Sequence, residues 1–129
     1  MSVTSDDLIA FAKKLIETDR NEVTCRSSTS RAYYAAYHLC QSYADLCPDN
    51  SHLKMGSHER LSDRYALHPT RTAKGISYIL VSMKRFRNSA DYDIDDPFDT
   101  STPVNLIAQY DTLTEKLIEF KGENTPKSA

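Results

Sequence analysis

Three side chains in the first half of the sequence could together bind a phosphate-containing ligand and act on it. Arg31, Tyr34 and His38 are spaced i, i+3 and i+7, so on a helix they share one stripe. A guanidinium can hold a phosphate, an aromatic ring can stack on a base, and an imidazole can move a proton near neutral pH. The same spacing also fits an ordinary solvated helix flank on which the histidine has no special role.

A second group of basic residues lies in the segment RFRNSADYDIDD, residues 85–96, and just before it. Lys84, Arg85 and Arg87 cluster where an apolar helical pattern ends, a position at which the helix dipole favours cations. Arg87 follows Leu80 by seven residues and Met83 by four. It should therefore lie at the edge of the buried face, from which it could reach a groove.

Carboxylates follow this basic group directly. Their spacing suggests a cation loop, but an EF-hand calcium loop needs a glycine at its sixth position and a glutamate at its twelfth, where Asp96 and Thr102 stand. We therefore expect no metal site and no cofactor. The interpretation we favour is a solvated loop that neutralises the basic group, through Asp91, Asp93, Asp95, Asp96 and Asp99.

Several functional classes lack the residues that they need. There is no serine-centred elbow, no phosphate-binding glycine loop and no HExxH. A net charge of −2 means that any contact with nucleic acid is local.

The three cysteines have no CxxC spacing and are expected as small buried residues rather than zinc ligands. Without a signal-peptide pattern or an apolar run near the roughly 20 residues of a membrane span, we expect a cytoplasmic protein with no membrane contact.

The elements that would position these residues are all helices. The 3.6-residue apolar period predicts helices over 4–18, 27–47, 58–67, 70–90 and 103–121. Thr4, Ser57 and Thr102 are the expected N-caps, Pro48 should stop the second helix, and Gly122 should end the last. The fold predicted is all-α: an antiparallel bundle of four main helices plus one short helix in residues 1–122, followed by a flexible tail, 123–129.

Each long helix should bury one apolar stripe. The expected core residues are Leu8, Phe11, Ala12, Leu15 and Ile16; Tyr33, Ala36, Tyr37, Cys40, Tyr43, Ala44 and Cys47; Ile76, Ile79, Leu80, Met83, Phe86 and Ala90; and Leu106, Tyr110, Leu113, Leu117 and Phe120.

Two of these segments together resemble the HEPN superfamily (higher eukaryotes and prokaryotes nucleotide-binding domains), and particularly its small stand-alone prokaryotic members with an R…ADY signature. They are SRAYYAAYH, residues 30–38, and RNSADY, residues 87–92. His58 and Leu61 in GSHERL look like the histidine-containing segment that such members carry between the two. The resemblance spans about residues 5–120.

The resemblance implies a helical bundle that dimerises so that the arginine motifs of two subunits face each other across a cleft. Many such proteins are metal-independent ribonucleases that serve as toxins, paired with a nucleotidyltransferase-like antitoxin, or act in phage defence. Their active motif is an arginine, a polar residue, and a histidine four to six residues after the arginine. Arg87 and Asn88 match this motif, whereas Tyr92 stands in the place of the histidine, with Asp91 and Asp93 beside it.

This departure bears on the chemistry. Metal-free RNA cleavage needs one group to deprotonate the 2′-hydroxyl and another to protonate the leaving oxygen. Tyr92, with an ordinary pKa of about 10, is a poor base at neutral pH but can donate a proton. Arg87 could hold the phosphate bidentately. His38 is the expected replacement base if its stripe faces the same groove, which makes Arg87, Asn88, Tyr92 and His38 the candidate catalytic set.

Two hypotheses follow. The first is a dimeric HEPN-like protein that binds RNA or nucleotides and acts as a ribonuclease of a toxin–antitoxin or phage-defence system, with RNA contacts from Arg31, Tyr34, Lys84, Arg85 and Asp91. The second is an inactive interaction module. In that case Arg87 and Asp91 form a structural ion pair, and the aromatic second helix builds the homodimer or a contact with a nucleotidyltransferase-like or other protein partner.

Overall fold

A computed structural model describes residues 3–124 of the chain. Within that range the protein is helical and has no strand. The elements are α1 (Ser5–Thr18), α2 (Glu22–Gln41), the 3-10 helix η1 (Ala44–Leu46), α3 (Ser57–Leu67), α4 (Arg71–Tyr92) and α5 (Thr102–Asn124). The predicted all-α bundle of four main helices and one short helix is therefore confirmed, and α3, with 11 residues, is the short one.

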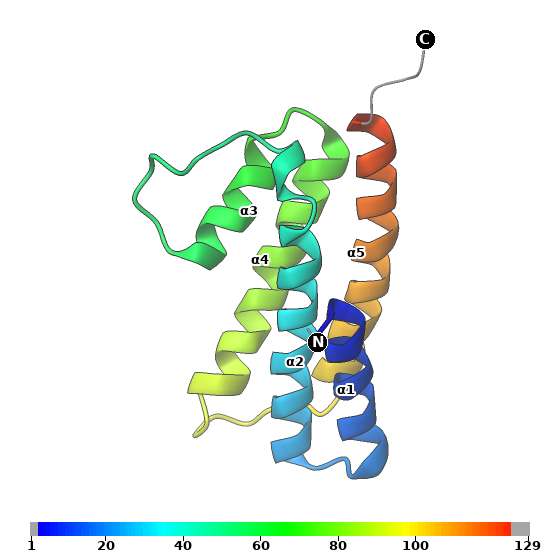
Figure 1. Ribbon diagram of the computed structural model, residues 1–129. Coiled ribbons are helices and arrows are strands. Elements are labelled where there is room, and N and C mark those ends of the chain that lie inside the picture. The colour runs from blue at the N-terminus through cyan, green and yellow to red at the C-terminus, as the bar shows by residue number, and fades with distance from the viewer. Residues whose placement is uncertain (1–2, 125–129) are drawn as a thin grey trace.

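Helix α2 lies at the centre of the bundle. It packs against α1, α4 and α5, and it runs antiparallel to α1 and α4 (Figure 1). Helix α3 packs mainly on α4 and more lightly on α2. The connection between η1 and α3 projects to one side of the bundle (Figure 1). Residues of α2, α3 and α4 can therefore meet on one side of the central helix.

The helix starts follow local capping signals. Thr4 and Asp7 form the predicted capping box at α1. Thr70 caps α4 through a bond from the backbone N–H of Ala73. The predicted start of α2 at residue 27 is wrong, because Asn21 and Thr24 form a second capping box and the helix begins at Glu22. Ser57 is the first residue of α3 and not its cap; Gly56 occupies the cap position without a side-chain bond.

The ends of the helices differ more from the prediction. Helix α2 stops at Gln41, six residues before the expected end, and a turn leads into η1. Helix α4 extends to Tyr92. Thr102 belongs to α5 itself, and α5 continues through Gly122 to Asn124. The side chain of Asn124 is 3.0 Å from Nε2 of His68. The first two residues of the predicted tail are thus helical, and residues 125–129 lie outside the described range.

The core is formed largely by the predicted stripes, but in α1 the predicted Leu8, Leu15 and Ile16 are only half-buried, and the buried Ile9 was not predicted. All five α5 residues of the predicted stripe are buried, as are the small residues of α2 that let neighbouring helices approach closely. Phe11 and Phe86 are exposed, because each lies on a flank that no neighbouring helix covers. The three cysteines are buried thiols, as predicted, and burial raises the pKa of Cys47 to about 11. No helix within residues 3–124 is both long and apolar enough to cross a membrane.

Candidate functional site

The guanidinium of Arg87 reaches from α4 onto the aromatic face of α2. Its Nη2 donates a hydrogen bond of 2.5 Å to the hydroxyl of Tyr34. The guanidinium carbon lies 5.1 Å from the ring centre of Tyr34 and 5.9 Å from that of Tyr33, distances at which a cation is attracted to an aromatic face. The antiparallel packing of α2 and α4 thus joins the two sequence segments that were singled out separately.

Neighbours on α4 complete the surroundings of Arg87. Its Nε lies 2.9 Å from Oδ2 of Asp91, an ion pair that lacks the direction of a hydrogen bond. Its Nη1 donates to Oδ1 of Asn88 at 3.2 Å. Ser30 on α2 donates to the same carboxylate oxygen of Asp91. Only 11% of the Arg87 side chain is exposed, so a phosphate could reach the guanidinium only by displacing one of these groups.

Helix α3 brings a histidine to this cluster. Nδ1 of His58 lies 2.7 Å from the hydroxyl of Tyr33, and the imidazole centre is 4.6 Å from the ring centre of Tyr37. Partial burial, followed by the positive charges of Arg87 and Lys84, lowers the pKa of His58 below its ordinary value. The imidazole is therefore neutral at neutral pH. Burial raises the pKa of Tyr33, which keeps its phenol protonated.

The predicted stripe of α2 lies beside the same cluster. The guanidinium carbon of Arg31 is 5.4 Å from the ring centre of Tyr34. The ring of His38 stacks on that of Tyr34, with the ring centres 6.5 Å apart and an angle of 28° between the planes. His38 is exposed and close enough to His58 to contribute to its lowered pKa. Arg31, Tyr34 and His38 therefore share one face with Arg87, as the hypothesis about His38 requires.

The remaining predicted residues lie less centrally. Tyr92 is 68% exposed, and the guanidinium carbon of Arg87 is 5.6 Å from its ring centre. Its hydroxyl has no hydrogen bond within the described part of the chain. Lys84 is partly buried and its charge reaches His58. The side chain of Arg85 is exposed, and no contact joins it to the cluster among residues 3–124.

A cavity of about 310 Å³ opens next to the ion pair, between α1, α2 and the end of α4. Arg31 and Asp91 both line it, together with Phe11, Leu15, Ser27 and Ser30. Two of the predicted RNA contacts thus share one recess. Phe11, which was predicted in the core, instead forms part of the apolar wall of this cavity.

Arg26 fixes the end of α4 and was missed by the sequence analysis. Its guanidinium donates to the carbonyls of Ser89 and Ala90 and to those of Asp93 and Asp96 in the following loop. It also pairs with Glu22. In residues 3–124, the expected neutralisation of the basic group is present in one ion pair, Arg87–Asp91, whereas the carboxylates that follow Asp91 in the loop make no ion pair. The loop is held through its backbone instead.

The chemistry available at this site is that of two guanidinium groups, two imidazoles and several phenols. No group of three or more histidine, cysteine or acidic side chains that could hold a metal ion occurs in the described range. No model of a protein family, no curated protein and no solved structure matches this chain. Conclusions about function therefore depend on the geometry of the cluster.

His58 is the residue of the site that pattern alone could not assign. Within the sequence it is one histidine on a short helix, and only the resemblance pointed to its segment. Its position depends on how α3 packs against α2 and α4, which no local spacing records. The signal that could have found it is the buried Tyr33, because a buried phenol needs a partner for its hydroxyl.

Proposed function

We propose that this protein is a HEPN-like, metal-independent ribonuclease that binds single-stranded RNA on the aromatic face of α2. The observation that carries the proposal is the gathering of His38, His58 and Arg87 around Tyr34, from three different helices. Stacking rings beside a cation are typical of sites that bind unpaired bases and their phosphates. The two imidazoles add groups that can exchange protons near neutral pH.

The reaction proposed is an internal transfer at phosphorus. The 2′-oxygen of the substrate forms a bond to the phosphorus while the bond from phosphorus to the 5′-oxygen breaks, which gives a 2′,3′-cyclic phosphate and a free 5′-hydroxyl. One imidazole accepts the proton of the 2′-hydroxyl and the other protonates the leaving 5′-oxygen. Arg87 stabilises the charge that develops on the phosphate, and Asn88 and Tyr92 donate hydrogen bonds to it.

Asp91 controls access to Arg87 in this mechanism. The carboxylate occupies the position next to Nε that an incoming phosphate would take. A phosphate binds a guanidinium through the same charge-assisted contacts as a carboxylate does. When substrate binds, its phosphate therefore replaces the carboxylate of Asp91 beside Arg87. Asp91 keeps the hydrogen bond that it already accepts from Ser30.

The test is cleavage of a fluorescent single-stranded RNA by the purified protein in excess EDTA. We expect the wild type to cleave this RNA and to leave an oligonucleotide without 2′-hydroxyls intact. His58→Ala or His38→Ala should lower the rate of cleavage at least 100-fold. If His58 is the base, its lowered pKa keeps it neutral at pH values below its ordinary 6.5, so the fall of the rate on the acidic side of the pH profile should lie below 6.5. On the alkaline side the rate should fall as the imidazole that serves as the acid loses its proton. Cleavage that both histidine variants retain in full would contradict the mechanism.

The second candidate function is an inactive interaction module, which the Arg87–Asp91 ion pair favours. In this case the pair is part of the structure, and the rings of α2 serve a protein contact. The partner proposed is a second copy of the chain or a nucleotidyltransferase-like antitoxin. Expression of the wild type alone should then leave growth unaffected, whereas a ribonuclease toxin should arrest it and Arg87→Ala should relieve the arrest.

A further inference from the structure

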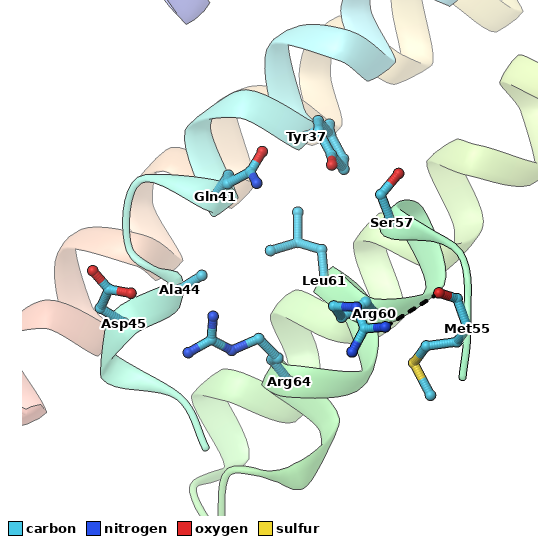
Figure 2. Close-up of a pocket in the computed structure, with 9 residues that line it drawn as sticks. All are labelled: Tyr37, Gln41, Ala44, Asp45, Met55, Ser57, Arg60, Leu61 and Arg64. Carbon is cyan, nitrogen blue, oxygen red and sulfur yellow. Dashed lines mark hydrogen bonds between the residues drawn. The ribbon is translucent and has the colours of Figure 1, made fainter. Parts of the chain in front are cut away.

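A second cavity, of about 440 Å³, lies between the C-terminal part of α2, η1 and α3 (Figure 2). Its volume falls within the range of pockets that bind small ligands. Its lining comes from two separate parts of the chain: Tyr37, Gln41, Ala44 and Asp45 on one side, and Met55, Ser57, Arg60, Leu61 and Arg64 on the other.

Two arginines on successive turns of α3 face this cavity, and with the one carboxylate of its lining, that of Asp45, they leave it a net positive charge. Arg64 donates from Nε and Nη2 to the carbonyls of Pro48 and Cys47, both at 3.1 Å. Arg60 donates to three carbonyls of the same connection, those of Asn50, Leu53 and Met55. Carbonyls orient a guanidinium without cancelling its charge. Neither arginine has an ion pair within residues 3–124, and Nη1 of Arg64 makes no hydrogen bond there, so it is available to a ligand.

The interior of the cavity suits a base, and its rim suits a phosphate. Figure 2 shows Leu61 in the middle, with Tyr37 on one side and the two arginines on the other. Ser57 and Gln41 add a hydroxyl and an amide that can bond to base edges. Because Gly56 leaves the first turn of α3 without a side-chain cap, free backbone N–H groups of that turn add to the positive potential.

The cavity continues the proposed RNA site along α2. Tyr37 lines the cavity and contacts His58 of the cluster. Ser27, Ser30 and Arg31 line the other cavity, beside Asp91. From residue 27 to residue 41 a helix rises roughly 20 Å, and all of these residues lie on one stripe of it. A single RNA strand could therefore contact both cavities with the Arg87 cluster between them.

We propose that the cavity between α2 and α3 binds a nucleotide of the same RNA strand, with Arg64 and Arg60 on its phosphate and Tyr37 stacked on its base. The inference rests on the proposed RNA-binding function and names a second contact point for the strand. It places the base contact directly beside the proposed point of cleavage, where Tyr37 contacts His58, and the phosphate contact at Arg64 six residues farther along α3.

The experiment measures binding of a fluorescent 2′-O-methyl RNA octamer, which cannot be cleaved, by polarisation at several salt concentrations. Arg64→Gln should raise the Kd about tenfold and reduce the slope of log Kd against log salt by about 0.7, the value for one lost phosphate contact on a single strand. Tyr37→Leu should raise the Kd by a similar factor with an unchanged slope, because it removes stacking and no charge.

Controls separate charge from folding. Lys13→Gln makes the same change in net charge on the exposed surface of α1 and should leave the Kd within twofold. Arg64→Lys loses the fork that holds the loop but keeps the charge, so it should retain the salt slope of the wild type. If Arg64→Lys and Arg64→Gln lose the same slope, the arginine acts on the loop and the inference is overturned.

The outcomes also separate this inference from the proposed function. If the wild-type protein does not bind the octamer, both the proposed function and the inference about this cavity are overturned. If the wild type binds and Arg87→Gln weakens binding while Arg64→Gln and Tyr37→Leu have no effect, only the role of this cavity is overturned. Titration with AMP distinguishes a free nucleotide from a nucleotide of an RNA strand as the ligand of the cavity. If AMP binds as tightly as the octamer and Arg64→Gln abolishes this binding, the cavity binds a mononucleotide and not a strand.

Discussion

Arg87 is surrounded by groups that compete for it. Tyr34 and Tyr33 offer it a hydroxyl and aromatic faces, whereas Asp91 offers the opposite charge. Rings and a bound anion can act on a guanidinium together, but two anions cannot both occupy the position next to Nε. The state of Asp91 therefore decides whether this arginine serves the structure or a ligand.

Replacing Asp91 by asparagine tests this directly. If Arg87 binds phosphate, Asp91→Asn should tighten binding of the RNA octamer several-fold, because the internal competitor loses its charge. Removal of a partly exposed ion pair should lower the free energy of unfolding by only about 1 kcal/mol or less. Polarisation titration and urea unfolding measure the two effects.

Asp93→Asn is the matched control for that prediction. It changes the net charge equally, and the carboxylate of Asp93 has no ion pair in residues 3–124, while its backbone contacts remain. It should bind RNA only slightly more tightly than the wild type. Equal effects of the two variants would show that net charge and not access to Arg87 controls binding. No RNA binding by any of the three proteins would favour the interaction module.

At the scale of elements, Arg26 joins α2 to the end of α4. Its guanidinium donates to two carbonyls of the last turn of α4, that of Ser89, which also accepts the backbone N–H of Asp93, and that of Ala90, and it lies 4.8 Å above the ring centre of Phe98. The last turn of α4 contains Asn88 and Asp91. The position of these two residues therefore depends on a side chain that makes no contact with the proposed ligand.

Arg26→Ala should destabilise the fold by about 2–4 kcal/mol, because it leaves several carbonyls without a charged donor. Urea unfolding followed by circular dichroism measures this loss. Arg20→Ala is the control, since Arg20 is exposed and donates a single bond to the carbonyl of Thr100; its effect should stay below about 1 kcal/mol. Similar losses in both variants would mean that Arg26 does not anchor α4.

Elements specified by short-range signals were predictable from the sequence. The Thr4 capping box depends on only four consecutive positions, and the α5 stripe needs only its own period. The end of α2 was not predictable in this way. The segment after Gln41 leaves the helix and joins a connection whose carbonyls are bound by Arg60 and Arg64, contacts that only the packed structure reveals.

The candidate site also contains some residues that the sequence could place and others that it could not. Helical phase predicted the shared stripe of Arg31, Tyr34 and His38, and it placed Arg87 at the edge of a buried face. It could not place His58, which reaches the cluster through the packing of α3. Nor could it reveal the two cavities, because each is formed by residues from distant parts of the chain.

At the scale of the molecule, the resemblance to HEPN proteins implies two copies of the chain. The outer face of α4 is a candidate contact, because Tyr78 and Val81 are both exposed there, one turn apart. Exposed aromatic residues of this kind are enriched in protein interfaces. An interface on this face would lie on the helix that carries Arg87 and leave the stripe of α2 open to RNA.

We expect sedimentation velocity at micromolar concentration to show a homodimer. Tyr78→Glu should convert it to a monomer, because the charge cannot be buried without a partner. Ile118→Glu places the same charge at an exposed apolar position of α5 and should leave the dimer intact. A wild-type monomer over the whole concentration range would contradict the prediction, and a dimer broken only by Ile118→Glu would move the interface to α5.

The way in which Arg60 and Arg64 hold the connection before α3 has a consequence for how this protein can change. The anchoring groups on the connection are main-chain carbonyls at Cys47, Pro48, Asn50, Leu53 and Met55. Any amino acid supplies a carbonyl, so the exposed side chains of residues 51–54 can be exchanged while the anchor persists. Substitutions in this short stretch, which precedes the cavity residue Met55, should therefore cost little stability.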